Sequence, residues 1–123
     1  MTARTNTFPR THRLSGKLAF AAVFDEKVKE ARGPLVMYAR PNALAHPRLG
    51  ISISRRVGTA VKRNRIKRLI REAFRLMQHD LPVGYDSILV VRPHETAMLA
   101  DYQRLLLHLS VKLHQTWQKR TAT

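Results

Sequence analysis

The segment from Thr59 to Met77 constrains the fold most, because its apolar residues recur at the spacing of an α-helix. At roughly 100° per residue they fall on one stripe, which such a helix buries against a core. The stripe consists of Ile66, Leu69, Ile70, Ala73, Phe74 and Met77, and the opposite side carries Asn64, Arg68, Arg71 and Arg75. The sequence therefore predicts an amphipathic helix that is packed on one side only.

The polar side of this helix is strongly basic. Between Arg55 and Arg75 nine Lys and Arg residues stand against one acid, Glu72, a net of +8 within the chain's formal charge of +15. A merely solvated helix face interleaves acids with bases, because like charges at i,i+4 cost a few tenths of a kcal/mol per pair. The excess of Arg over Lys favours bidentate contacts with phosphate groups. We therefore expect this helix to bind nucleic acid.

Alternating and helical patterns elsewhere predict a sheet and two further helices. The expected strands are residues 35–40, 49–54 and 88–91, and the expected helices are residues 16–29, with Ser15 as N-cap, and 98–118. A further strand could be split from the first two. At 123 residues the chain is one domain, an α+β fold of two layers. We expect a basic flexible tail over residues 1–13, an RNA-binding domain over 14–118 and a C-terminal tail over 119–123.

Composition narrows the setting. The longest apolar stretch, Leu18 to Phe24, is far too short to cross a bilayer, so no membrane association is expected. Cysteine is absent, which excludes disulfides and thiolate metal sites and agrees with a reducing cytoplasm. We predict a soluble, cytoplasmic protein.

The titratable residues do not form a catalytic or metal-binding pattern. The acids Asp25, Glu26, Glu30, Glu72, Asp80, Asp86, Glu95 and Asp101 are scattered along the chain. The histidines His12, His46, His79, His94, His108 and His114 show no ligand spacing such as i,i+4. A self-contained metal nuclease needs carboxylates that converge on its cations. We therefore expect no catalytic residue and no metal ligand in this chain.

The surroundings of the basic helix favour RNA over DNA. A helix-turn-helix would place a short helix just before the basic one, but a strand precedes it here. The outer face of the sheet would carry Tyr38, Arg40, Ser52, Ser54 and Arg92, a polar floor suited to single-stranded RNA. Phe20 and Phe24, spaced i to i+4, could stack on unpaired bases, but from spacing alone an ordinary core position is favoured.

Two neighbouring segments, Gly50–Gly58 and Ala60–Phe74, closely resemble the signature of the bacterial ribonuclease P protein subunit. The triplet Arg63-Asn64-Arg65 and the continuation over residues 67–71 occur together in that family at this spacing. The resemblance extends over residues 14–113, since Arg13-Leu14, Phe20, Val23 and Phe24 resemble the family's first helix and Tyr38 its cleft tyrosine. The main departure is Arg55, where the family usually has Lys, and this change keeps the charge.

The resemblance implies both a fold and a function. The implied fold has three helices and a four-stranded sheet in the order α-β-β-β-α-β-α, of the ribosomal protein S5 domain 2-like type. A left-handed βαβ crossover around the basic helix departs from the usual right-handed rule. The implied function is to bind one copy of a catalytic RNA and the 5′ leader of precursor tRNA, and to assist removal of that leader by an endoribonuclease. RNA and Mg²⁺ would perform the hydrolysis, and the protein alone would hold no cofactor.

The resemblance and the charge pattern together assign residues to two surfaces. The surface for the catalytic RNA comprises Arg55, Arg56, Arg63, Asn64, Arg65, Arg68, Arg71 and Arg75. The cleft for the leader comprises Phe20, Phe24, Val36, Tyr38, Ser52, Lys67 and Arg92. Arg63, Asn64 and Lys67 would lie near the junction of RNA, leader and bound metal. This assignment reverses the interpretation of the two phenylalanines as ordinary core.

Three other interpretations remain open from the residues. A ribosomal or ribosome-associated protein shares the basic charge and small α+β size, but would bind ribosomal RNA. A stand-alone nuclease is disfavoured by the scattered carboxylates. A DNA-binding module is disfavoured by the missing helix-turn-helix.

Overall fold

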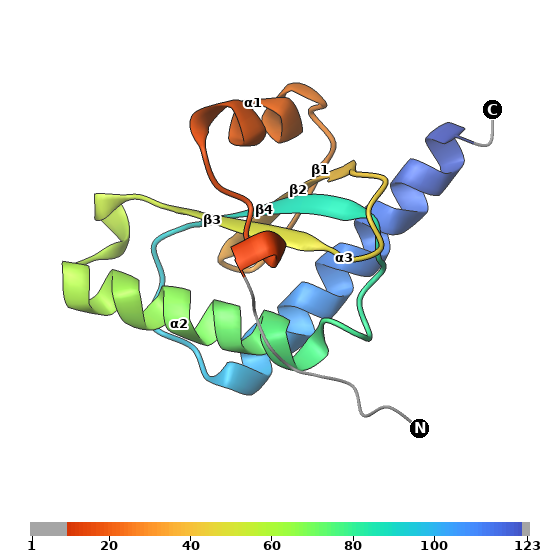
Figure 1. The fold of residues 1–123 in the computed structure, drawn as a ribbon. Coiled ribbons are helices and arrows are strands. Elements are labelled where there is room, and N and C mark those ends of the chain that lie inside the picture. The colour runs from red at the N-terminus through yellow and green to blue at the C-terminus, as the bar shows by residue number, and fades with distance from the viewer. Residues whose placement is uncertain (1–9, 122–123) are drawn as a thin grey trace.

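A four-stranded sheet forms the centre of the protein in a computed structural model that describes residues 10–121 (Figure 1). The helices are α1 (Lys17–Asp25), α2 (Ala60–Met77) and α3 (Leu99–Thr121), and the strands are β1 (Lys29–Arg32), β2 (Leu35–Pro41), β3 (Arg48–Ile53) and β4 (Tyr85–Val91). Short 3-10 turns cover Arg10–His12 and Arg55–Val57. The expected α+β class and the order α-β-β-β-α-β-α are confirmed.

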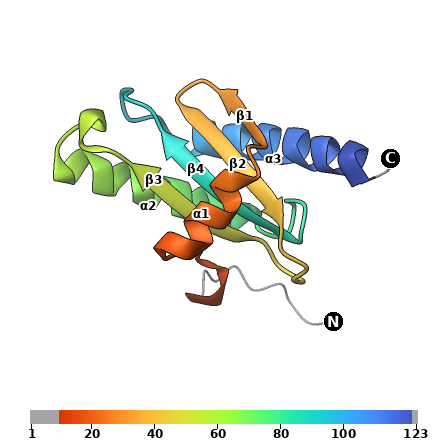
Figure 2. The same ribbon diagram turned by 90° about the horizontal axis from the view of Figure 1, so that it is seen from above.

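The sheet has the strand order β1-β2-β4-β3 and is mixed. Strand β2 pairs antiparallel with both β1 and β4, whereas β3 and β4 are parallel and are connected through α2. Figure 2 views the sheet from the α1 side: looking along the two parallel strands, β4 lies to the right of β3 and α2 passes beneath the sheet. This connection is left-handed, as the resemblance implied, against the usual rule for such units.

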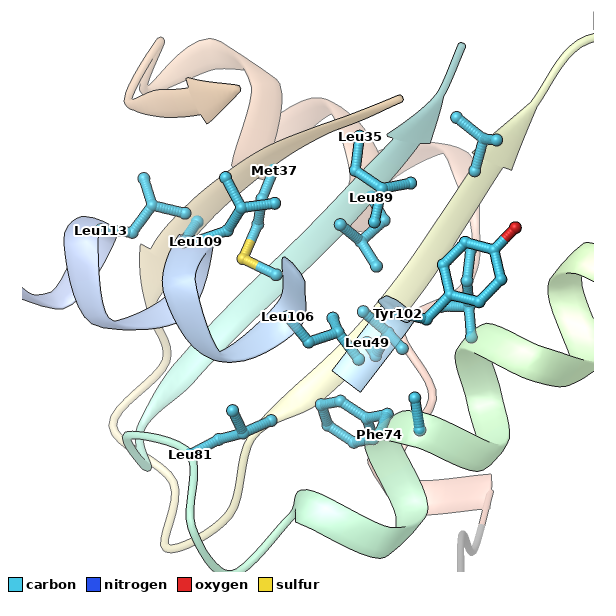
Figure 3. Close-up of a cluster of buried hydrophobic side chains, with 14 of the residues drawn as sticks. Leu35, Met37, Leu49, Phe74, Leu81, Leu89, Tyr102, Leu106, Leu109 and Leu113 are labelled. Atoms are coloured by element: carbon cyan, nitrogen blue, oxygen red, sulfur yellow. The ribbon is translucent and has the colours of Figure 1, made fainter. Parts of the chain in front are cut away.

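The main core lies between the sheet and the pair α2 and α3 (Figure 3). The sheet contributes residues such as Leu35, Met37 and Leu89, which are almost completely buried. The predicted stripe of α2 faces them, with Ile66, Ile70, Ala73 and Phe74 buried and Leu69 and Met77 partly buried. Helix α3 buries Tyr102, Leu106, Leu109, Leu113 and Trp117. The helical periodicity therefore located this core correctly.

Helix α1 lies alone on the opposite face of the sheet (Figure 1), where Leu14, Val23 and Ile88 form a second, small cluster. It ends at Asp25, four residues before the predicted end, because Lys27 adopts a left-handed conformation and the chain turns into β1. The prediction that Ser15 caps this helix is wrong: Gly16 occupies the cap position, and no side chain caps the helix. The fourth strand is therefore β1, which follows α1 and is not split from the first two strands as expected; of its residues only Lys29 lay within the predicted helix.

Both ends of the described chain are more ordered than the two predicted tails. Residues 10–12 form a 3-10 turn, Arg13 pairs with Leu49 of β3, and the His12 ring packs 4.0 Å from the His46 ring. Helix α3 continues to Thr121, so residues 119–121 are helical. Parts of the two predicted tails, residues 10–12 and 119–121, thus have helical structure, whereas residues 1–9 and 122–123 lie outside the described chain. No helix within residues 10–121 is both long and apolar enough to span a membrane.

Candidate RNA interface

Hydrogen bonds fix the N-terminus of helix α2, which carries the basic surface. The Thr59 hydroxyl accepts a hydrogen bond from the backbone N–H of Lys62 at 3.2 Å, which is a standard N-cap. The Arg63 guanidinium donates its Nε–H to the Gly58 carbonyl at 3.2 Å. The first turn of the helix, including one arginine of the predicted triplet, is therefore held in place by local hydrogen bonds.

Most cations predicted to face RNA are exposed. The exposed cations are Arg65, Arg68 and Arg71 on α2 and Arg55 and Arg56 in the preceding 3-10 turn. The neutral Asn64 is also exposed, whereas Arg63 is half-buried. Among the described residues, no carboxylate forms an ion pair with Arg65, Arg68 or Arg71. These charges are therefore not neutralised within the protein. Gathering them on one surface costs electrostatic free energy that an anionic partner offsets.

Arg75 differs from the other predicted contacts. Its guanidinium donates to both carboxylate oxygens of Glu72, at 3.0 Å and 2.5 Å. The hydrogen bond from Arg75 lowers the pKa of Glu72 and, in return, raises that of Arg75. Within α2, Lys62 has a weaker link, 4.0 Å to the fully exposed Glu95. One end of the basic surface is thus paired with an acid of the same helix.

The register of the sheet brings the predicted cleft residues together on the α1 face. Val36 of β2, Val90 of β4 and Ser52 of β3 are successive partners and form one row across three strands. Tyr38, Ile88 and Gly50 form the next row. Because side chains at every second position share a face, both rows point toward α1.

The two phenylalanines of α1 pack over the second row and remain half-buried. The ring of Phe24 lies edge-on to Tyr38 with 4.8 Å between centroids, and Phe20 lies 6.3 Å from Phe24. Phe20 rests directly on Gly50: a Cβ at that position would lie 2.6 Å from the ring. The rings thus contact the small cluster on one side and keep part of their surface open. Phe20 and Phe24 can therefore belong to the small core and to the cleft at the same time.

An open groove runs beside α1 on the same face. Its lining includes Val36, Tyr38 and Arg92, as predicted, together with Val90 and, from strand β1, Lys29, Glu30 and Ala31. The Lys29 ammonium lies 5.6 Å from the centre of the Tyr38 ring, within reach of a cation–π contact. Lys67 lies on α2, beneath the other face of the sheet, and does not line this groove.

A second groove connects the α1 face to the basic helix along the edge of β3. It is lined by Arg13, Leu14, Ser15, Gly16, Phe20, Leu49, Gly50, Ile51 and Arg71. Neighbouring atoms exclude water from part of the Arg71 guanidinium, and this desolvation together with the charge of Arg13 lowers the pKa of Arg71. An arginine remains protonated in neutral water even so. Two guanidinium groups therefore face a groove that also contains an aromatic ring.

A family model described as ribonuclease P matches residues 8–117. The chain belongs to the ribonuclease P protein family. Two curated family members are close in sequence. The ribonuclease P protein component of Methylococcus capsulatus is 46% identical over 92 residues, which are 74% of this chain and 71% of the relative. That of Brevibacillus brevis is 44% identical over 102 residues, 81% of each chain.

Solved structures of the ribonuclease P protein family agree with the fold. The structure of a Staphylococcus aureus RNase P protein mutant with defective mRNA degradation activity gives a TM-score of 0.75 at 30% identity. The match covers 86% of this chain and 90% of that chain. The left-handed connection and the helix on the far face of the sheet thus belong to an architecture that the ribonuclease P family shares.

Several residues that line the grooves of this family member do not stand out in the sequence pattern. Val90 sits in the run Ile88-Leu89-Val90-Val91, which is apolar throughout, so no alternation shows which side faces the groove. Lys29 was placed in a helix, and Arg13 in a flexible tail. Only the pairing of Arg13 with Leu49 brings that arginine to the edge of β3. Of these three residues, only Val90 could be assigned to the groove once the strand register of β4 is known.

No constellation of acids and histidines suited to a metal ion occurs within residues 10–121. The carboxylate with the best-defined partners, Asp86, accepts hydrogen bonds from Arg48 at 2.7 Å and 2.6 Å and from Asn42 at 2.8 Å. Asp86 therefore links β4 to β3 and to the loop between β2 and β3. The described surface offers basic and aromatic contacts rather than a cluster of acids.

Proposed function

We propose that this chain binds the RNA subunit of ribonuclease P through α2 and holds the single-stranded 5′ leader of precursor tRNA in the grooves beside α1. One observation carries the proposal: along α2 lie exposed cations that have no carboxylate partner among residues 10–121, next to grooves lined by aromatic rings. The names of the relatives support the same assignment, since they are ribonuclease P protein components.

The contact with the catalytic RNA is electrostatic. Its residues are Arg55, Arg56, Arg63, Asn64, Arg65, Arg68, Arg71 and Arg75. The buried stripe of α2 holds their backbone rigid, so that binding RNA orders few additional groups. Arg75 joins this surface by exchanging Glu72 for a phosphate. Lys67, half-buried on the same helix, contacts RNA or leader where the two meet rather than within the groove.

The contact with the leader combines stacking with charge. Phe20, Phe24 and Tyr38 offer ring surface to unpaired bases, which is worth about 1 to 3 kcal/mol per stacked base. Val36 and Ser52 provide the floor, and Arg92 and Lys29 stand at its rim. A single strand has free base faces and can lie in such a groove, whereas a duplex hides them.

The chemical step belongs to the ribonucleoprotein. In this proposal one protein joins one RNA, and the RNA with its Mg²⁺ ions hydrolyses the phosphodiester bond. The protein lowers the repulsion between two polyanions and keeps the leader extended. Purified chain without RNA is then inactive on precursor tRNA, and cleavage by the chain alone would overturn this division of labour.

The central experiment recovers the chain from its native cell extract, sequences the bound RNA and tests the pair on a precursor tRNA. We expect ribonuclease P RNA and cleavage at the mature 5′ end. With about six phosphates contacted, affinity for that RNA weakens on the order of 10³-fold between 50 and 200 mM salt. Recovery of ribosomal RNA alone, or an affinity that barely responds to salt, would contradict the proposal.

A second experiment separates leader binding from RNA-subunit binding. Tyr38→Ala and Phe20→Ala each remove one ring and weaken leader binding about 5- to 150-fold, the equivalent of 1 to 3 kcal/mol. Binding of the RNA subunit stays close to wild type. Leu18→Ala is the matched control, because this residue is on the same helix but is 88% exposed. Equal losses on both ligands would mean that the rings serve only to pack α1.

A further inference from the structure

We propose that Arg32, Arg104 and His108 form a second phosphate-binding site, which takes a backbone phosphate of RNA at the β1 edge of the sheet. The proposal rests on the proposed function, because it assigns one more contact to the same RNA-containing complex. These three residues line a groove together with Asp101 and Leu105. None of them belongs to the basic surface of α2 or to the grooves beside α1.

The place of this site in the fold separates it from the basic helix. Strands β1 and β3 are the two edges of the sheet, three strand spacings apart, or about 14 Å. Arg71 of α2 lines the groove at the β3 edge, whereas Arg32 belongs to β1. One phosphate cannot bridge this distance. The two basic surfaces therefore meet different phosphates.

Arg32 is positioned by a neutral partner. Its Nη1 lies 2.8 Å from Nδ1 and 3.1 Å from Nε2 of His108. A guanidinium only donates hydrogen bonds, so a ring nitrogen of His108 accepts this one and the ring is neutral in that arrangement. Within the described chain no carboxylate forms an ion pair with Arg32. The charge of Arg32 is thus oriented without being neutralised.

Arg104 completes the site from one helical turn before His108. Its Nη2 donates to Oδ1 of Asp101, and Oδ2 of Asp101 accepts from the backbone N–H of Met98 at 3.1 Å. Among the described residues that line the groove Asp101 is the only acid, so these two guanidinium groups leave a net charge of +1 there. A guanidinium has five N–H donors, and the contact with Asp101 occupies only part of that capacity. The remaining donors are available to a phosphate.

The basic character continues along α3. Lys112 follows His108 by four residues, as His108 follows Arg104, so the three side chains form a row with steps of about 6 Å. Beyond Asp101 the helix contains no further acid. Apart from Asp101, three residues before Arg104, no acid of α3 lies within one turn of this row, which favours an anionic partner over plain solvation. The chain has a net charge of +15 and is proposed to bind RNA. The phosphate backbone of that RNA is therefore the anionic partner that we assign to this row.

The experiment compares two variants that lose the same charge. Arg32→Gln/Arg104→Gln removes the proposed site, and Lys17→Gln/Lys27→Gln removes two exposed cations at the ends of α1. The measured quantity is the ratio of the Kd values for ribonuclease P RNA at 200 and 50 mM salt. Because the site takes one phosphate, its removal should lower this ratio about 3.5-fold. The control variant leaves the ratio near that of wild type.

The source of the phosphate is distinguished by a second arm. If the ratio for ribonuclease P RNA is unchanged but that for precursor tRNA binding to the assembled ribonucleoprotein falls, the phosphate belongs to the substrate. The proposal is overturned if neither ratio falls further than in the control. Arg32→Lys/Arg104→Lys, which keeps the charges, retains most of the ratio, and thermal unfolding shows that all variants remain folded.

A reference variant distinguishes failure of the second phosphate site from failure of the proposed function. Arg65→Gln/Arg68→Gln removes two exposed cations of α2. If that variant binds ribonuclease P RNA as tightly as wild type, the proposed function fails. If it binds weakly while the β1-edge variant matches the control, only the second site fails.

Discussion

Substitution of Gly50 by alanine tests how α1 is held over the sheet. The added Cβ would lie 2.6 and 2.7 Å from two ring carbons of Phe20 and 3.1 Å from the Leu14 carbonyl oxygen. Carbon atoms in contact prefer 3.5 to 4.0 Å, so the overlap with the ring is about 1 Å. Overpacking of this kind typically costs about 1 to 3 kcal/mol. Because Phe20 is half-buried and can swing partly outward, we expect a loss of about 2 kcal/mol.

A double-mutant cycle isolates the clash with the ring. In a Phe20→Ala background the ring is gone, and Gly50→Ala meets only the Leu14 oxygen, so its cost falls below about 1 kcal/mol. The coupling free energy from urea unfolding of the four proteins is then about 1 to 2 kcal/mol. Ser52→Ala, on the same face of β3, serves as the control and changes stability by about 0.5 kcal/mol or less.

The same variant carries a functional expectation. Displacement of Phe20 removes one stacking surface, so Gly50→Ala weakens leader binding about 5- to 150-fold and leaves the affinity for ribonuclease P RNA near wild type. The predicted clash with Phe20 is excluded if Gly50→Ala lowers the free energy of unfolding by the same amount in the wild-type and Phe20→Ala backgrounds. It is also refuted if the single substitution leaves both stability and leader binding unchanged.

Three further predictions follow from other contacts. Trp117→Phe removes the 2.9 Å hydrogen bond that the buried indole donates to a β2 carbonyl, and should cost about 1 to 3 kcal/mol in urea unfolding followed by far-UV circular dichroism; an unchanged midpoint would contradict it. Asp86→Ala leaves Arg48 unpaired and should cost about 2 kcal/mol, below the 3 to 5 kcal/mol of a fully buried pair because the Arg48 side chain is 34% exposed. The lowered pKa of Glu72 means that its bond to Arg75 stabilises the fold above the ordinary carboxyl pKa of about 4.3 and that this gain is lost as pH falls through the lowered value. The stability difference between wild type and Glu72→Gln should therefore shrink on acidification from about pH 6 to pH 3, and a constant difference would exclude the ion pair as its source.

Long, regular patterns made most of the fold predictable. Helices α2 and α3 each repeat their apolar residues over several turns, so the buried stripes stand out above local irregularities. Every second residue of β2 and β3 faces the main core, which produces the period of two in their sequences. The order of elements and the basic surface of α2 follow from these patterns. The four-stranded sheet and the handedness of its crossover needed the family resemblance.

What local patterns could not supply was set by pairing at a distance. Strand β1, Lys29–Arg32, is short, exposed and polar, and it becomes a strand only because Gly33 turns it back onto β2. Arg32 and His108 are 76 positions apart and meet through the packing of α3 beneath the sheet. Contacts of this kind depend on the register and on the layering of the whole domain. No window of sequence contains them.

The protein has two cores of unequal size, and this difference affects how easily α1 moves relative to the sheet. Helix α1 is attached through the small cluster around Val23 and Ile88, whereas α2 and α3 share the large core on the other side. Segments with few buried apolar contacts open at a lower free-energy cost than the rest of a domain. We therefore expect α1, which carries Phe20 and Phe24, to separate from the sheet at a lower free-energy cost than is needed to unfold the main core. Under the proposed function, such opening would let an RNA strand enter the grooves from the side, with no free end to thread.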